Sequence, residues 1–318
     1  MCDPIWVPLD PEVAVVLDKM NALGNPPYEE LPIAGARALA MTAFDDYVGP
    51  APEVDRIVNR FVPGPTADLP VRIYWPKGVD PLGVLVYLHG SGWAIHNIDV
   101  TDVPVRALAN ATGCVVVAVN YQKAPEHKFP VPFDDAYAAV AWTASHLAEL
   151  AKATSPLGVI GDSAGGNLAA AVCLRARDGE GPLIALQVLI YPATDYGWDT
   201  ASAHENAVGY LLERSAVRWF WGQYLASESE AANPFVSPLR ATSLAGLPPA
   251  FVVTAEFDPL RDEGELFAER LRQAGVPVKL HRYEGMTHAF FWMLGAVGQS
   301  RALMAEIGAE VRSAFGAS

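Results

Sequence analysis

A serine stands between glycines in the segment GDSAGG at residues 161–166, with Ser163 as its third residue. An apolar run (residues 157–160) precedes the segment, and a helical pattern (residues 167–177) follows it. In isolation the segment is typical of a plain glycine turn. Because a strand comes before it and a helix after it, it predicts a nucleophile elbow, a strained turn that presents a serine hydroxyl. The N-terminal end of the helix would also favour negative charge that develops beside Ser163.

A serine nucleophile needs a base, and in this kind of site the chain order is serine, acid, histidine. His204, His281 and His288 are the histidines that follow Ser163. His204 lies in a helical insertion, and His281 lies inside an expected strand (residues 278–283). His288 comes just after that strand, at the sheet edge where α/β proteins collect catalytic groups. We therefore expect His288 to be the base.

The orienting acid is expected after the preceding strand, at residues 249–254. Asp258 lies in the loop that follows this strand, with Glu256 and Asp262 as neighbours. Asp262 begins a helical pattern and fits better as the N-cap of that helix. Asp195, after an earlier strand, is the alternative. We prefer Asp258, whose role would be to hold the tautomer of the histidine and to stabilise the imidazolium.

A second glycine-rich turn, HGSGW at residues 89–93, follows the most apolar strand (residues 84–88). In hydrolases with a nucleophile elbow, a turn at this place supplies backbone N–H donors for an oxyanion. The competing interpretation is a dinucleotide-binding turn, because Gly90 and Gly92 match the first two glycines of G-x-G-x-x-G. That interpretation is poor, since the third position is Ile95 and no ribose-binding acid follows convincingly.

Short apolar runs alternate with helical patterns from about residue 55 onward, which predicts a doubly wound α/β sheet. Several runs are continuously apolar, as are strands that a parallel sheet buries on both faces. The expected strands are residues 54–61, 71–75, 83–89, 114–120, 157–161, 185–191, 249–254 and 278–283. The expected core helices are residues 102–112, 132–150, 167–177 and 262–274.

Two helical stretches fall outside this alternation. Residues 1–50 contain helical patterns at 11–23 and 33–47, and residues 196–235 contain another at 215–224. We expect both stretches to pack together as a cap over one edge of the sheet. The hydrolase core would then consist of residues 51–195 and 236–318, with no linker that divides independent domains.

The composition excludes several classes of partner. The 318 residues carry 22 Lys and Arg against 36 Asp and Glu, a formal net charge of −14. This charge disfavours nucleic acids and the anionic surface of a membrane, and no apolar run reaches the ~20 residues of a membrane span. Cys114 and Cys173 fall in apolar and helical patterns, as small core residues do. Free thiols, with residues 1–20 lacking a basic segment, predict a cytoplasmic protein.

With these residues the chain resembles the α/β-hydrolase superfamily, and within it the hormone-sensitive-lipase-like, bacterial family IV carboxylesterases. GDSAGG at 161–166, DPLRDE at 258–263 and HAF at 288–290 are similar to the family's nucleophile, acid and histidine motifs. Residues 121–130 are similar to its Y-R-L-A-P-E-x-x-F-P segment. The resemblance implies a mostly parallel, eight-stranded sheet covered by helices on both faces, with a helical cap.

Two positions depart from the family pattern. Ser91 replaces the middle glycine of the family's HGGG, so its side chain could strain the turn or narrow the acyl pocket. Gln122 and Lys123 stand where the family usually has Arg and Leu. Glu126 and Asp134 are expected to be structural partners in ion pairs or hydrogen bonds.

The resemblance implies a serine carboxylesterase that acts on a small-molecule ester of short or medium chain length and needs no cofactor or metal. Backbone N–H groups of Ser91, Gly92 and Ala164 would hold the oxyanion. The cap would enclose an apolar pocket, lined by some of the aromatic residues Trp93, Tyr210 and Trp219, with Trp6, Phe44, Tyr47, Trp198, Phe220 and Trp221 as further candidates.

Relatives often dimerise through their last strand, which implies a homodimer through residues 278–283. Two alternatives to an esterase stay open. One is an amidase or arylformamidase, which uses the same triad. The other is a non-catalytic small-molecule receptor of the same fold.

Overall fold

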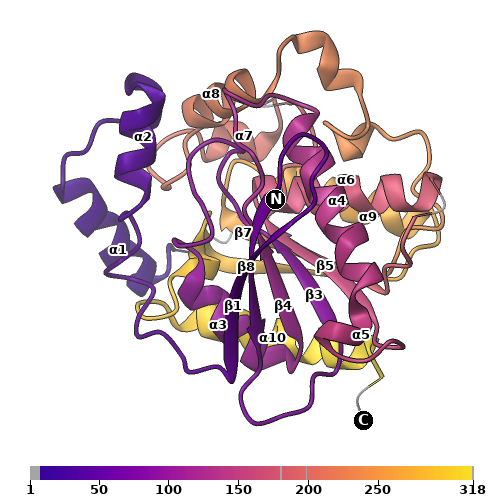
Figure 1. The fold of residues 1–318 in the computed structure, drawn as a ribbon. Coiled ribbons are helices and arrows are strands. Elements are labelled where there is room, and N and C mark those ends of the chain that lie inside the picture. The colour runs from indigo at the N-terminus through magenta and orange to yellow at the C-terminus, as the bar shows by residue number, and fades with distance from the viewer. Residues whose placement is uncertain (1–7, 180, 198, 317–318) are drawn as a thin grey trace, which may run out of the picture.

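Eight strands form one sheet at the centre of the molecule (Figure 1). The computed structural model describes residues 8–179, 181–197 and 199–316. The strand order is β1-β2-β4-β3-β5-β6-β7-β8; β2 is antiparallel to both of its neighbours, and the strands from β4 to β8 run parallel. This architecture confirms the predicted sheet. In chain order the strands span Arg56–Val62, Leu69–Trp75, Val84–Leu88, Val115–Val119, Leu157–Asp162, Leu186–Ile190, Ala250–Phe257 and Val278–Thr287.

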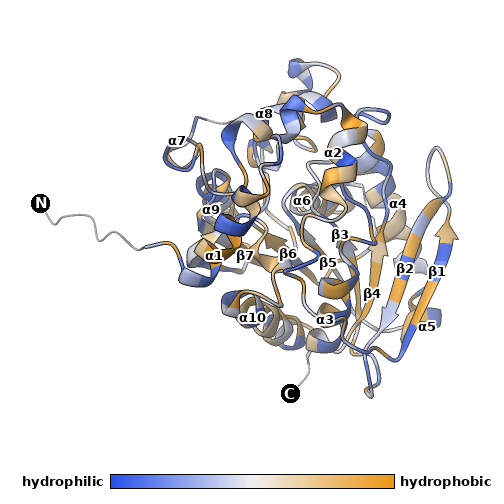
Figure 2. Ribbon diagram, turned by 90° about the vertical axis from the view of Figure 1, so that its left-hand side faces the viewer, coloured by the Kyte–Doolittle hydropathy of each residue, from blue (hydrophilic) through white to orange (hydrophobic). Residues whose placement is uncertain are grey.

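Side chains of the central strands alternate between two hydrophobic cores, one on each face of the sheet. In β3, Val84, Val86 and Leu88 join one core, whereas Leu85 and Tyr87 join the other. All five are buried, which explains the continuous apolar run, and Figure 2 shows hydrophobic residues concentrated in the central strands. The first core is covered by α4 (Val131–Ser145), α6 (Ala164–Asp178) and α9 (Arg261–Gln273), and the second by α3 (Asp102–Thr112) and α10 (Gly298–Ala314).

The helices of the core differ from the prediction in three places. α6 begins at Ala164, directly after Ser163, rather than at residue 167. α4 ends at Ser145 and is followed by the short helix α5 (Leu147–Leu150). The 17-residue helix α10 is absent from the predicted elements, although it buries Leu303, Ile307 and Val311 at four-residue spacing.

The cap, as far as its two segments are described, contains four α-helices. α1 (Pro11–Ala22) and α2 (Ile33–Ala40) come from the N-terminal segment, and α7 (Ala201–Glu205) and α8 (Arg214–Tyr224) come from the insertion (Figure 1). Ala36 and Ala40 of α2 form one buried cluster with Ala216 and Phe220 of α8 and with Ile95, which follows β3. The two segments therefore pack against each other and against the loop at the C-terminal end of β3.

The predicted helix over residues 33–47 is wrong in its second half. α2 ends at Ala40, and residues 41–47 form turns. These turns place Phe44 edge-to-face against Trp292, with ring centroids 5.1 Å apart, so tertiary packing overrides the helical pattern here. The 3₁₀ helices of the described chain are Tyr28–Glu30, Glu228–Ala232, Pro238–Arg240 and Phe290–Trp292.

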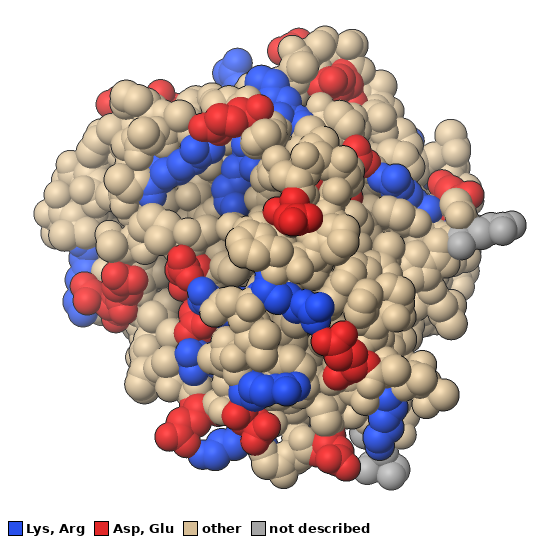
Figure 3. All heavy atoms as spheres, in the orientation of Figure 1, with Lys and Arg blue, Asp and Glu red and all other residues tan. Residues whose placement is uncertain are grey.

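Acidic and basic side chains are interspersed on the face of the molecule that Figure 3 shows. Two ion pairs confirm the structural roles predicted for two carboxylates. Glu126 binds Arg37 of α2 at 2.6 Å, and Asp134 binds Arg175 of α6 at 2.5 Å. The first pair ties the cap to the loop after β4, and the second ties α4 to α6.

Cys114 and Cys173 are buried and free of disulfide bonds, as predicted for small core residues. Cys2 lies outside the described residues. Within the described part of the chain, no helix combines the length and the hydropathy that a membrane crossing requires.

Candidate active site

Ser163 occupies a sharp turn between β5 and α6, with backbone angles φ 55° and ψ −122°. A non-glycine residue in this left-handed region is strained, and such strain marks functional turns. The turn is tight enough to exclude side chains on both sides. A Cβ on Gly161 would lie 2.2 Å from the carbonyl oxygen of Gly165, and a Cβ on Gly165 would lie 1.9 Å from that of Leu88. The glycines therefore permit the elbow that the sequence predicts.

The three residues predicted as nucleophile, base and acid meet at the C-terminal edge of the sheet. Ser163 Oγ lies 2.9 Å from Nε2 of His288, and Nδ1 of His288 lies 2.7 Å from Oδ2 of Asp258. The other carboxylate oxygen of Asp258 accepts a hydrogen bond of 2.8 Å from the backbone N–H of Leu260. The ring of Tyr191 packs 4.5 Å from that of His288. Asp258 is fully buried and His288 is 7% exposed, so these hydrogen bonds are largely shielded from water.

The other candidate acids have structural partners elsewhere. Asp195 forms an ion pair with Arg240 at 2.5 Å. Glu256 accepts a hydrogen bond of 2.7 Å from the backbone N–H of Gly285. The expectation that Asp262 caps its own helix is wrong. Leu260 is the N-cap of α9, and the Asp262 carboxylate instead accepts from the backbone N–H of Ser202 in α7.

The other candidate bases also lie away from Ser163. His204 contacts Asp199 at 2.9 Å, and His281 contacts Glu306 at 2.7 Å. Both histidine side chains are about half exposed. Their contacts are those of surface residues.

The loop after β3 presents backbone N–H groups beside Ser163. Within the described chain, the N–H groups of Ser91 and Gly92 have no protein acceptor. Ala164 is the first residue of α6, so its N–H also has no partner inside the helix. All three residues line the same pocket as Ser163. This is the arrangement that an oxyanion hole needs.

Asp162, the residue before Ser163, holds this loop in place through hydrogen bonds. Its Oδ1 accepts hydrogen bonds from the N–H of Gly90 at 2.9 Å and from the hydroxyl of Tyr87 at 2.7 Å. Burial raises the pKa of the Asp162 carboxyl to about 6, against the opposing effect of these two donors. Sequence reasoning assigned no role to Asp162, because its position in the motif gives no indication of the contact with Gly90.

The side chain of Ser91 is held by a buried tyrosine. The Tyr121 hydroxyl donates to the carbonyl oxygen of His89 at 2.7 Å, so Ser91 Oγ, also 2.7 Å away, donates to Tyr121. Ser91 keeps a negative φ, whereas Gly92 and Trp93 have positive φ. The serine thus fits the turn without backbone strain, and its hydroxyl fastens the loop to the segment after β4.

Two neutral histidines hold the same loop. Nδ1 of His96 lies 3.0 Å from the carbonyl oxygen of Gly90, and Nδ1 of His89 lies 3.3 Å from it. Burial lowers the pKa of His96 to about 4 and that of His89 well below its usual value. Both rings therefore stay uncharged at neutral pH and donate from Nδ1.

The second departure from the family pattern also lies behind this loop. Gln122 donates through its backbone N–H to Asp135 at 2.9 Å. Lys123 donates to the side-chain oxygen of Asn120 at 2.6 Å and to the carbonyl oxygen of Tyr121 at 3.0 Å. Burial lowers the pKa of the Lys123 ammonium to about 7. These bonds fix the segment that carries Tyr121.

A pocket of about 400 Å³ opens above Ser163, between the sheet edge and the cap. Of the three predicted pocket aromatics, Trp93 lines it, but Tyr210 and Trp219 do not. Tyr210 instead stacks on Phe257 with ring centroids 4.9 Å apart. Trp219 packs edge-to-face on Phe220 with ring centroids 5.0 Å apart and lines a separate surface groove. The aromatic residues of the lining are Tyr28, Phe44, Trp93, Phe220, Trp221 and Trp292.

Of the remaining aromatic candidates, Tyr47 is absent from the lining. Trp6 and Trp198 lie outside the described residues. No group of three or more His, Cys, Asp or Glu residues within the described ranges could hold a metal ion.

The chain is similar to known hydrolases. A family described as alpha/beta hydrolase fold matches residues 85–292. The chain is 40% identical over 276 residues to the carboxylic ester hydrolase LipN of Mycobacterium tuberculosis, a match that covers 85% of this chain and 73% of that protein. It is 36% identical over 315 residues to an arylesterase of Saccharolobus solfataricus, covering 97% of this chain and all of that protein.

Solved structures show the same likeness. A thermostable esterase from Pseudomonas putida has a TM-score of 0.93 and 33% identity over the full length of both chains. An alpha/beta hydrolase enzyme from the metagenome of Lake Arreo has a TM-score of 0.92 and 39% identity, covering 97% of this chain and 99% of that chain. The fold and site define an α/β hydrolase. The chain belongs to the hormone-sensitive-lipase-like carboxylesterases of the α/β-hydrolase family.

We expect Asp162→Asn to change how stability depends on pH. Because folding raises the pKa of Asp162 from 3.8 to about 6, its contribution to stability is fully present below the lower value and is lost as the pH rises through the higher one. Asparagine keeps the acceptor for Gly90 and Tyr87 but does not titrate. The free energy of unfolding of the variant, relative to wild type, should therefore increase by about 2 kcal/mol between about pH 4 and pH 8. Urea unfolding at both pH values measures it, and an unchanged difference would contradict the assignment.

Tyr121→Phe should slow ester hydrolysis by loosening the loop after β3, whose backbone N–H groups lie beside Ser163. The change leaves the Ser91 hydroxyl and the His89 carbonyl without their buried partner, which typically costs 1–3 kcal/mol. We expect kcat for a p-nitrophenyl ester to fall about tenfold with KM nearly unchanged. The control is Tyr74→Phe, which removes another buried tyrosine hydroxyl, bonded to Asp102 at 2.8 Å. Equal kcat values for the two variants would refute the role of Tyr121 in the loop.

Proposed function

We propose that this carboxylesterase hydrolyses short- to medium-chain carboxylic esters through Ser163, His288 and Asp258, with an acyl-enzyme intermediate. The observation that carries the proposal is the continuous hydrogen-bond chain from Ser163 Oγ to the buried Asp258 carboxylate, with steps of 2.9 and 2.7 Å. Its serine end lies in the floor of the pocket. The relatives named as carboxylic ester hydrolase and arylesterase support the same reaction class.

The reaction would proceed by acyl transfer. Ser163 Oγ attacks the ester carbonyl while Nε2 of His288 takes its proton, and Asp258 stabilises the imidazolium without taking that proton. The N–H groups of Ser91, Gly92 and Ala164 donate hydrogen bonds to the oxyanion. His288 then protonates the leaving alcohol. Water attacks the acyl-enzyme by the same steps in reverse and releases the acid.

The pocket supports an uncharged ester as substrate. Its lining is rich in aromatic side chains, and the charged side chains in that lining are Glu29, Asp162 and Glu213, with no Lys or Arg among the described residues. A carboxylate on the substrate would therefore meet like charge and no counter-ion. Phe220 packs directly on the loop after β3 in this lining, since a Cβ on Gly92 would lie 2.1 Å from its ring.

Two further expectations stay predictions. The first is a homodimer through β8, which is an edge strand of the sheet. The second is a cytoplasmic location, which the two buried free thiols support.

Ser163→Ala should abolish ester hydrolysis, because the hydroxyl that forms the acyl-enzyme is lost. The wild type should hydrolyse p-nitrophenyl acetate or butyrate, and the variant should lose at least about 10³-fold in kcat. A reactive phosphonate should add its mass to the wild type at Ser163 and leave the variant unlabelled. Hydrolysis of anilides in preference to matching esters would favour an amidase. A wild type that cleaves neither and binds a small molecule tightly would favour a receptor.

We expect a negative charge on the acyl group of the substrate to lower the rate of hydrolysis. p-Nitrophenyl butyrate and the p-nitrophenyl monoester of succinic acid have acyl groups of similar size, but the second carries a carboxylate. We expect kcat/KM for the succinate ester to be at least about tenfold lower, and Glu29→Gln with Glu213→Gln to narrow the gap. Equal rates for both esters would contradict the interpretation of the pocket.

A further inference from the structure

We propose that Asn206 and Ser202, in the cap insertion, are positioning residues for the catalytic acid Asp258. Neither side chain touches the reacting atoms. Both hold the backbone of the loop between β7 and α9, which carries Asp258. The proposal rests on the proposed function, since it assumes that Asp258 orients His288 during ester hydrolysis.

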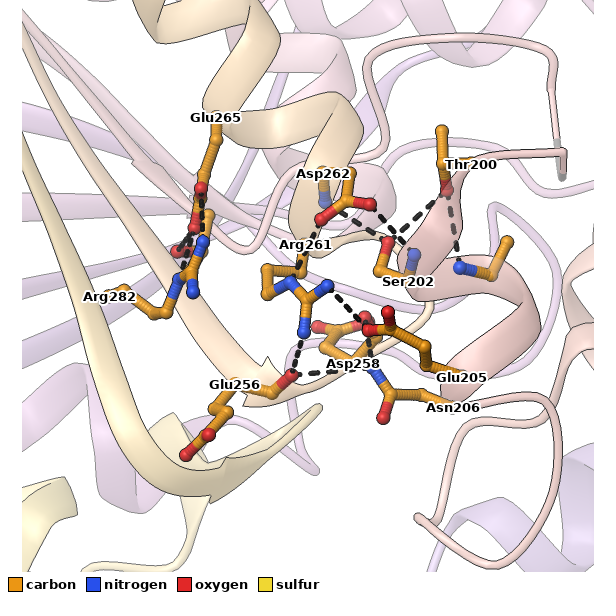
Figure 4. Close-up of polar contacts among 12 residues, drawn as sticks. Thr200, Ser202, Glu205, Asn206, Glu256, Asp258, Arg261, Asp262, Glu265 and Arg282 are labelled. Carbon is orange, nitrogen blue, oxygen red and sulfur yellow. Dashed lines mark hydrogen bonds and ion pairs between the residues drawn. The ribbon is translucent and has the colours of Figure 1, made fainter. Parts of the chain in front are cut away.

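Asn206 binds the acid loop directly. Its side-chain Nδ2 donates to the carbonyl oxygen of Asp258 at 3.2 Å and to that of Glu256 at 3.3 Å, as Figure 4 shows. Only 3% of Asn206 is exposed. Asn206 is also the C-cap of α7, where its own N–H is bonded to the carbonyl oxygen of Ser202. One buried amide thus binds the backbone carbonyl oxygens of both Glu256 and Asp258.

Ser202 binds the same loop one step further along the chain. Its hydroxyl donates to the carbonyl oxygen of Pro259 at 2.9 Å and accepts from the N–H of Asp262 at 3.1 Å. Its backbone N–H donates to the Asp262 carboxylate at 2.7 Å. Ser202 is fully buried. The carbonyl oxygens of Asp258 and Pro259 therefore each accept a hydrogen bond from α7 or its C-cap residue, in the cap.

The loop itself gives Asp258 few other supports. The Asp258 carboxylate contacts His288 and the N–H of Leu260, and the backbone that carries it is buried at residues 258–260. The carbonyl oxygen of Asp258 also accepts from the backbone N–H of Arg261 at 3.1 Å, so Asn206 provides its second hydrogen bond, whereas the Ser202 hydroxyl is the only donor to the Pro259 carbonyl among the described residues. Loss of a hydrogen bond to a buried carbonyl is costly, so the loop would shift if the cap insertion did not supply these donors. Such a shift would move the carboxylate relative to the imidazole, and small displacements of catalytic groups reduce rates strongly.

The decisive variant is Asn206→Leu, which keeps the side-chain size and removes both hydrogen bonds. We expect kcat for p-nitrophenyl butyrate to fall about tenfold, with KM within about twofold of wild type. The acidic limb of the kcat/KM profile should move to lower pH by roughly half a unit, because a displaced carboxylate stabilises the imidazolium less. The other titratable groups near His288, Asp162 and the Tyr191 phenol, are unchanged in this variant.

The matched control is Glu205→Gln, on the exposed side of α7. Glu205 pairs with Arg261 at 2.9 Å and is 60% exposed, so it joins the same two elements without holding the backbone of Asp258. Its kcat and pH profile should equal those of wild type. Ser202→Ala provides a second test through the Pro259 carbonyl and should move kcat and the acidic limb in the same direction by a smaller amount. If Asn206→Leu does not fold, Ser202→Ala decides the question by the same criteria.

Variants with a lower melting temperature but wild-type kcat and an unmoved acidic limb would overturn the proposal, because the contacts would then serve stability alone. This result would leave the proposed function intact. A wild type that hydrolyses no ester would instead overturn the proposed function, and this proposal with it.

Discussion

The close approach of three backbone segments at Ser163 is the constraint on which the site depends. The end of β5 turns into α6 so sharply that Gly165 lies against the carbonyl of Leu88, at the end of β3. That contact fixes where the loop after β3 must pass. The loop can then present the N–H groups of Ser91 and Gly92 to the same point as the N–H of Ala164. The proposed nucleophile and the proposed oxyanion hole thus depend on the same packing contact, and the strain at Ser163 is held by the sheet around it.

Buried polar groups, more than surface ion pairs, maintain this geometry. The Gly90 N–H binds Asp162, and the His89 carbonyl binds Tyr121. His89 and His96 are kept uncharged by burial, so the loop contains no buried imidazolium that would need a counter-ion. An oxyanion in this region therefore meets oriented N–H dipoles that require no reorganisation. Fixed dipoles of this kind are what such a site uses to stabilise developing charge.

The sequence allowed the sheet to be predicted, and also the sharp turn at Ser163 and its proximity to His288 and Asp258, because each follows a local rule of strand periodicity, turn chemistry or chain order. What it did not reveal depends on contacts between distant segments. α10 has apolar residues at helical spacing but is absent from the predicted elements, and the turns that follow α2 place Phe44 against Trp292. Residue type alone places Tyr210 and Trp219 in the pocket, but the direction of each side chain, before α8 and on α8 respectively, follows from tertiary packing. The partner of Ser91 lies 30 residues away, beyond any local pattern.

The cap of this protein is not a separable lid. Through α8, the insertion supplies pocket walls at Ala216, Val217 and Phe220, and through α7 it supplies donors to the acid loop. Residues 206–213 join the two helices, so a change that shifts α8 to admit a larger acyl group acts on the same short connection that begins at Asn206. Selectivity and the placement of Asp258 therefore share one structural element. Removing the insertion would leave the buried carbonyl of Pro259 without its donor, at about 1–3 kcal/mol, and the carbonyl of Asp258 with the N–H of Arg261 alone. The core therefore depends on its cap to hold the loop that carries Asp258.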